Sequence, residues 1–343
     1  MSTVFREFVK KIGSGEHTHT DLSREEAYTA MKMMLQKEAT PAQIGAFLIA
    51  HRIKRPTSAE LAGMLDAYYE LGPQLPALDK TVVILSQPYD GRDRTIPLSP
   101  LTALVLSSVG IPVLQHGGDC MPTKEGVPLI DIWQGLGINW RNRSLTEIHA
   151  LLREFGLGFI YVPEHFPLAY DLVPYRAQIG KRPPIATLEL IWCPYAGAVQ
   201  LVAGYVHPPT EIIITEALHL LGKDQFITVK GLEGSCDLPR DRACITAVNC
   251  GQRRERLIVN ALHYSMKGSN PRWSDLDTSV QLMTAVLEGQ TNELQTSVIW
   301  NSGFYLWQCG YSPDLVAGLT TAKELLVSNQ VKKQWQQLRS VLD

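Results

Sequence analysis

The stretch SREEAYTAMKMML, residues 23–35, decides how this chain begins to fold. Ser23 and Glu26 have the spacing of a capping box, in which each side chain accepts a hydrogen bond from a free backbone N–H at a helix start. Ala27, Ala30, Met31 and Met34 follow at the spacing of one helical face. The stretch therefore predicts a helix with one apolar side.

The same device occurs twice more in the next thirty residues. Thr40-Pro41-Ala42-Gln43 adds a proline at the first helical position, and Ile44, Phe47 and Leu48 supply the apolar face. Thr57-Ser58-Ala59-Glu60 begins a third helix that continues through Tyr68. Three capped helices joined by short loops predict a small helical domain over residues 1–72.

A linker containing Pro73 and Pro76 runs to Lys80, and after it the pattern changes. Short β-branched runs alternate with helical segments, which favours an α/β domain with a mainly parallel central sheet over residues 81–343. The expected strands are 81–85, 111–115, 159–162, 199–206 and 226–229. The expected helices are 101–109, 128–136, 145–155 and 211–221, followed by a helical C-terminal third at 276–287, 293–308, 313–326 and 331–342.

Composition limits the classes of protein that fit. The chain has 343 residues, 45% of them hydrophobic and 19% charged, with a net charge of −2, which excludes a disordered chain and a globally basic surface. The most apolar stretch, 98–114, contains Pro100 and Pro112 and is too polar for a membrane helix. Six cysteines without a CxxC pair indicate reduced thiols, so we expect a cytoplasmic protein.

Several segments resemble the anthranilate phosphoribosyltransferase family. They are the helical opening from Asp21 to Leu48, Glu60-Leu61-Ala62-Gly63, His116-Gly117, the 176–180 segment, Gly231 with Gly234, and Asn301. The resemblance runs nearly end to end. It implies a cleft between the helical and α/β domains, with helices near 170–192 joining the first. It also implies a phosphorylated small-molecule donor, Mg²⁺ where catalysis occurs, and a homodimer through the helical domain.

The segments matching the family's phosphate sites differ from its pattern. Active members carry a glycine-rich GTGGD loop whose bare N–H groups hold pyrophosphate. Here Gln87-Pro88-Tyr89-Asp90-Gly91 stands in that place, and Pro88 has no N–H to donate. The resemblance implies that eight residues contact phosphate or nucleic acid. They are Gly91, Arg92, Arg94, Ser99, His116, Gly117, Lys181 and Arg182.

The acceptor and metal sites are matched only in part. Arg176 aligns with the arginine that places the acceptor's carboxylate, and His165 with a histidine on the approach to it. The family's DE pair for Mg²⁺ falls on Cys236-Asp237, and a cysteine is a poor ligand for a hard cation. Glu233 is the substitute carboxylate, so the implied metal residues are Glu233 and Asp237.

Two functions remain open. One is a divergent transferase that moves a phosphoribosyl group from 5-phosphoribosyl 1-pyrophosphate to anthranilate or another aromatic nitrogen. The other is a non-catalytic binder of single-stranded nucleic acid in the same groove, because Pro88…Gly91, Ser99-Pro100 and Leu232-Glu233-Gly234 resemble a paralogous branch with such a member. Simpler interpretations stand beside both. Arg92, Arg94 and the run 253–256 suit solvated loops, His116 suits a packed histidine, and Trp192, Trp300 and Trp307 suit the core.

Overall fold

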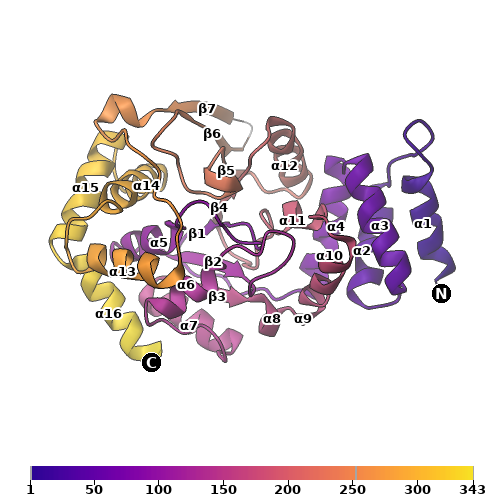
Figure 1. Cartoon of the computed structure of the whole chain (residues 1–343), viewed down its shortest axis with the longest axis horizontal. Coiled ribbons are helices and arrows are strands. Elements are labelled where there is room, and N and C mark those ends of the chain that lie inside the picture. The colour runs from indigo at the N-terminus through magenta and orange to yellow at the C-terminus, as the bar shows by residue number, and fades with distance from the viewer. Residues whose placement is uncertain (1, 252, 343) are drawn as a thin grey trace.

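The computed structural model describes residues 2–251 and 253–342. A bundle of helices at the N-terminal end stands beside a larger α/β body, and the C-terminal helices lie at the far side of that body (Figure 1). This is the fold class that the sequence predicts. Among the described residues, no helix is both long enough and apolar enough to cross a membrane.

Four helices form the N-terminal bundle: α1 (Thr3–Gly13), α2 (Arg24–Leu35), α3 (Pro41–Lys54) and α4 (Ser58–Leu71). The three predicted capping boxes are all present, because each side chain bonds its partner's backbone in both directions. Helix α1 was not predicted from the sequence, although Phe5, Phe8 and Ile12 form its buried face at helical spacing.

Close packing joins α2 to α4 and then to the α/β body. A Cβ atom on Gly63 would lie 2.0 Å from the carbonyl oxygen of Arg24, so only glycine allows this approach. The Arg24 guanidinium donates to both carboxylate oxygens of Asp66, at 2.6 and 2.8 Å. It also donates to the carbonyl of Leu220, at 2.7 Å, on helix α12 (Pro208–Leu220). One side chain therefore connects three helices.

The α/β body is built on one seven-stranded sheet in the order β3-β2-β1-β4-β5-β6-β7. The first five strands are parallel, and β6 and β7 add to the edge in antiparallel pairs. Strands β1 to β3 are buried along their whole length, as expected when helices cover both faces. The strands are β1 (Val82–Leu85), β2 (Val113–Gly117), β3 (Leu157–Tyr161), β4 (Val199–Gly204), β5 (Gln225–Val229), β6 (Cys244–Cys250) and β7 (Arg253–Val259).

The predicted alternation of strands and helices is confirmed, with bounds shifted by a few residues. The β6–β7 pair was not predicted. The helices around the sheet are α5 (Ser99–Ser108), α6 (Leu129–Gly135), α7 (Leu145–Phe155), α12, α13 (Leu276–Leu287), α14 (Gln295–Gln308), α15 (Leu315–Val327) and α16 (Gln330–Leu342).

Four short helices lie between β3 and β4, and two of them pack against the bundle. Helix α10 (Val173–Ile179) contacts α3, and α11 (Ile185–Leu188) contacts α4. Both follow α8 (Val162–His165) and α9 (Pro167–Tyr170). Trp192, just beyond α11, and Trp300 on α14 are buried as the core interpretation expects, whereas Trp307 is half-buried.

A buried carboxylate holds the loop between α3 and α4. The Glu60 side chain is fully buried and accepts from the backbone N–H groups of Thr57 and Leu22 and from Lys54 Nζ, at 2.7, 2.9 and 2.8 Å. His51 Nε2 lies 3.4 Å away. Burial by itself would raise the pKa of Glu60, but His51, Lys54 and Thr57 outweigh it and lower this pKa to about 2.

We expect Glu60→Gln to lower the free energy of unfolding by about 3–5 kcal/mol, since Lys54 then stays buried without its main counter-charge. Because the folded pKa of Glu60 is depressed, its contribution is complete above the unfolded value and disappears as the pH falls from about 4.5 towards 2. Denaturant melts of wild type and variant should converge over that range. Glu70→Gln, which removes an exposed partner of Lys32, is the control and should change little. Equal stability of E60Q and wild type at pH 7 would contradict this account.

Candidate functional site

The loop that follows β1 is closed by contacts within the chain. Gly91 has a φ of +75° and donates its N–H to the carbonyl of Pro88, at 3.0 Å. Arg92 exchanges backbone hydrogen bonds with Val127, at 2.8 and 3.3 Å. A Cβ atom on Gly91 would lie 2.3 Å from the backbone of Gly126, so the two segments touch. The N–H groups of Gly91 and Arg92 therefore donate to backbone carbonyls of the chain and are not free to bind a phosphate.

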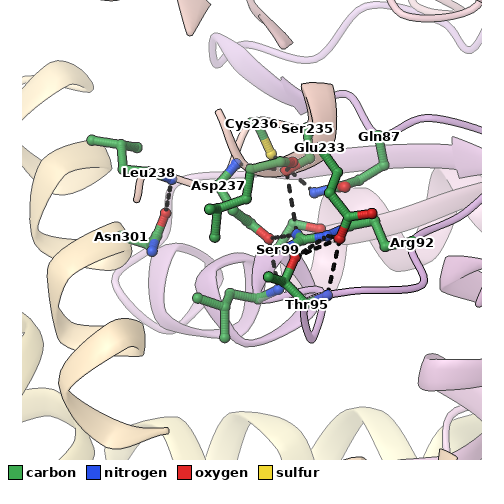
Figure 2. Close-up of polar contacts among 12 residues, drawn as sticks. Gln87, Arg92, Thr95, Ser99, Glu233, Ser235, Cys236, Asp237, Leu238 and Asn301 are labelled. Carbon is green, nitrogen blue, oxygen red and sulfur yellow. Dashed lines mark hydrogen bonds and ion pairs between the residues drawn. The ribbon is translucent and has the colours of Figure 1, made fainter. Parts of the chain in front are cut away.

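Arg92 points inward from this loop and is 1% exposed. Its guanidinium bonds Asp237 on the segment after β5, the hydroxyl of Ser235 at 3.2 Å and the hydroxyl of Thr95 (Figure 2). Asp237 also accepts from the N–H of Leu98, at 2.8 Å. Burial raises the pKa of Asp237, and the charge of Arg92 opposes that rise. The pair is a buried salt bridge between distant parts of the chain.

Glu233 lies beside this pair, and its carboxylate also bonds other residues of the chain. It accepts from the N–H and hydroxyl of Thr95, at 2.9 and 2.7 Å, and from Lys124 Nζ, while the Arg92 Nε atom lies 3.7 Å away. Burial would raise the pKa of Glu233, but hydrogen bonds from Lys124 and Thr95 and the charge of Arg92 hold it well below its ordinary value. Both predicted metal residues thus face cations of the protein itself.

This arrangement does not fit Mg²⁺. A magnesium ion needs near-octahedral oxygen ligands, and the nearest carboxylates here are neutralised by Arg92 and Lys124. Cys236, which stands at the other position of the pair, is buried and receives a hydrogen bond from Gln87 at 3.3 Å. Among residues 2–251 and 253–342, no three His, Cys, Asp or Glu side chains form a group that could hold a metal.

Ser99 is held in a buried polar network. Its hydroxyl accepts from the Gln115 amide at 3.0 Å, and the amide oxygen of Gln115 accepts from the Trp133 indole at 3.0 Å. Ser99 is the first residue of α5 and has no exposed surface. The network joins α5, β2 and α6, so its geometry serves packing of the α/β body.

His116 and Gly117 end strand β2, under the bulk of Tyr89. The Tyr89 hydroxyl and His116 Nδ1 are 2.5 Å apart, and the imidazole packs edge-on against Trp192. Burial lowers the pKa of His116 to about 4. The cavity that remains beside Tyr89, His116 and Gly117 measures about 10 Å³, roughly the space of one water molecule.

The predicted acceptor residues are bound within the protein. Arg176 on α10 is 2% exposed; it pairs with Glu189 and contacts the sulfur of Met121 at 3.2 Å. His165 bonds the N–H of Tyr161 through Nδ1, at 2.9 Å, and the carbonyl of Arg143 through Nε2, at 2.7 Å. The cavity lined by Glu189 and the surrounding aromatic rings is also about 10 Å³.

Arg182 instead borders an open groove of about 700 Å³ between the helical bundle and the α/β body. Its walls come from the end of α3, the loop between α10 and α11, and the start of α12. Four basic side chains line the groove: Arg52, Arg55, Arg182 and His207. The described lining residues include no aspartate or glutamate. Asp90 lies behind the wall, 3.3 Å from Arg182 Nε.

The structure thus separates the predicted site residues into two groups. Arg92, Ser99, His116, Gly117, Arg176, His165, Glu233 and Asp237 take part in internal contacts, and Gly91 shapes the closed loop. Three basic side chains remain open to solvent. They are Arg94, which is 75% exposed beside Glu233, the exposed Lys181, and the half-buried Arg182. Lys124, which pairs with Glu233, was not predicted from the sequence, nor were the groove residues Arg52, Arg55 and His207. The basic last turn of α3 is a sequence signal for Arg52 alone.

Comparison with known proteins identifies the family of this chain. Residues 6–72 match the glycosyl transferase family, helical bundle domain, and residues 90–330 match the glycosyl transferase family, a/b domain. The chain belongs to this family. An anthranilate phosphoribosyltransferase from a Polaromonas species is 26% identical over 94% of this chain and 93% of its own length.

Solved structures agree on the fold. The anthranilate phosphoribosyltransferase of Thermus thermophilus superposes with a TM-score of 0.77 at 24% identity, over 98% of this chain and 99% of its own. The Saccharomyces cerevisiae enzyme, solved in complex with PRPP (5-phosphoribosyl 1-pyrophosphate) and Mg, gives 0.85 at 14% identity, over 100% and 99% of the two chains. The family resemblance is confirmed, and at these identities the superpositions establish architecture alone.

We expect Arg92→Met to lower the free energy of unfolding by about 3–5 kcal/mol, because Asp237 stays buried without a counter-charge. The double variant R92M/D237N should recover most of this loss, which a double-mutant cycle in denaturant melts would measure. Arg94→Met is the matched control and should change little, since that side chain is 75% exposed. An R92M protein as stable as wild type would show that the buried pair contributes nothing.

We also expect the His116 imidazole to stay neutral down to a pH of about 4 in the folded protein. An unfolded histidine binds a proton near 6.5, so this residue removes stability progressively as the pH falls from about 6.5 to about 4. Nitrogen-15 spectra of the imidazole would follow the titration directly. In H116Q the melts should lose that part of the pH dependence. A His116 signal that titrates near pH 6.5 would refute the assignment.

Proposed function

We propose that this chain is a non-catalytic member of its family that binds single-stranded nucleic acid in the groove between the helical bundle and the α/β body. The observation that carries the proposal is the lining of that groove. It presents Arg52, Arg55 and Arg182 with no acidic side chain among its described residues, although the whole chain is slightly acidic. A local excess of guanidinium groups suits a polyanion.

The rest of the lining favours an unpaired strand. Ile53, Pro56, Pro184, Pro208 and Ile213 offer apolar surface between the arginines. Base faces are free to meet such surface only when the strand is not in a duplex. The resemblance of the 88–100 and 232–234 segments to the nucleic-acid-binding branch supports the same partner. A homodimer through the helical domain and a cytoplasmic location stay predictions.

The transferase hypothesis draws support from the family and from the PRPP and Mg complex of the yeast enzyme. In this chain it would need Arg92, Arg94 and Ser99 on phosphates, Glu233 and Asp237 on Mg²⁺, and Arg176 on the acceptor. Phosphoryl and pyrophosphate groups are held chiefly by preorganised donors and cations. Because all of those residues except Arg94 are committed to internal contacts, we infer that the donor site is lost.

The groove can be tested with a fluorescent oligonucleotide and a pair of matched variants. R52Q/R55Q should weaken binding roughly 10- to 30-fold at about 0.1 M salt, because each lost phosphate contact removes about 0.7 from the slope of log affinity against log salt. K323Q/K333Q removes the same charge from exposed positions on α15 and α16, at the other end of the molecule, and should bind as wild type does (Figure 1).

The transferase alternative is tested on the same preparations. We expect 5-phosphoribosyl 1-pyrophosphate with Mg²⁺ to leave the melting temperature unchanged and anthranilate fluorescence to stay constant. A ligand at 100 times its Kd would stabilise the fold by roughly 2.7 kcal/mol, which a melt resolves easily. Mg²⁺-dependent stabilisation by this donor, without salt-sensitive oligonucleotide binding, would overturn the proposal and restore the enzyme.

A further inference from the structure

Strand β7 forms an exposed basic edge of the sheet. It pairs with β6 on one side, and no described strand pairs with its other side. Five of its seven residues are exposed, and three of these are arginines: Arg253, Arg254 and Arg256. Such edges commonly carry charge because charge discourages pairing with another sheet. This basic run is already apparent in the sequence, and the groove does not account for it.

A single buried carboxylate anchors two of these arginines. Glu211 Oε1 accepts from Arg254 at 2.8 Å, and Glu211 Oε2 lies 3.9 Å from Arg256. The Glu211 side chain is 3% exposed, whereas those of Arg254 and Arg256 are 41% and 55% exposed. One negative charge therefore positions two guanidinium groups that still face solvent. Glu255 is the one acidic residue in the strand, so the edge stays net basic.

The basic edge adjoins the groove through the first turn of α12. Pro208 and Thr210 in that turn line the groove, and Glu211 is the next residue. Figure 1 shows β7 running along one border of the body with its first residues towards α12. The arginines of the groove and those of β7 thus lie on two sides of one helix start.

Charge selects the occupant of this edge. A second copy of the chain that paired through β7 in antiparallel fashion would bring the arginine clusters together, which is unfavourable. A polyanion gains from the same charges, and continuity with the groove places it there. Residues two apart on a strand are about 6.6 Å apart and point to the same face, so Arg254 and Arg256 form a row.

We propose that the nucleic-acid strand bound in the groove continues past the start of α12 and onto β7, where the row of Arg254 and Arg256 contacts its phosphates. This inference rests on the proposed function, because it extends the same ligand to a second surface. The binding site is then longer than the groove alone. Affinity should rise with oligonucleotide length beyond what the groove can hold.

The test compares a short and a long single strand, of about 6 and about 20 nucleotides, within and beyond the usual span of one binding unit. The variant R256Q removes one arginine of the row but keeps the Arg254–Glu211 bond, and so protects the fold. For the long strand its salt slope should fall by about 0.7 and its affinity roughly 5-fold at about 0.1 M salt. For the short strand it should bind as wild type and K323Q/K333Q do.

The outcomes separate the two proposals. If the short strand binds through Arg52 and Arg55 but R256Q leaves the long strand unaffected, the extension is overturned and the groove stands. If neither strand binds in a salt-dependent way, the proposed function itself fails. Binding of a poly-glutamate peptide that R256Q weakens, with no effect on either oligonucleotide, would assign β7 to an acidic protein segment and also overturn the extension.

Discussion

The buried pair between Arg92 and Asp237 is the interaction on which the centre of this molecule depends. It joins the loop after β1 to the segment after β5, and Ser235, Thr95 and Leu98 complete its hydrogen bonds. A charge pair of this kind is expensive to desolvate and costly to break, so its value lies in fixing one arrangement of the surrounding loops. With Lys124 on Glu233 and Arg92 on Asp237, both carboxylates that would face a metal are paired with cations of the chain.

The region that matches the family's active site and the open groove are two different parts of this molecule. The region that corresponds to the family's chemistry is packed, with cavities of about 10 Å³. The open volume lies instead beside it, where α3, the α10–α11 loop and α12 meet. A net charge of −2 conceals this groove, because charges summed over the chain say nothing of where they gather.

Most of the fold could be predicted from the sequence, because its signals are local. Each capping box spans four residues, and most helices and the parallel strands show their own periods, so even the C-terminal helices could be placed, although helix α1 was missed. The antiparallel strands β6 and β7 were not predicted, because their residues are mixed in polarity. The site was harder, since Arg92 and Asp237 bond across 145 positions of sequence. Its residue types suggested phosphate and metal ligands, and only the three-dimensional structure shows that they bind one another.

Arg24 gives the groove a property that none of its own residues would reveal. Its guanidinium fastens α2 to Asp66 on α4 and to the last turn of α12, so both walls are tied to one another away from the opening. The bundle and the α/β body are thereby linked in the unbound protein. A groove whose walls are linked in this way leaves less ordering for a partner to impose, and such ordering is one of the free-energy costs of binding.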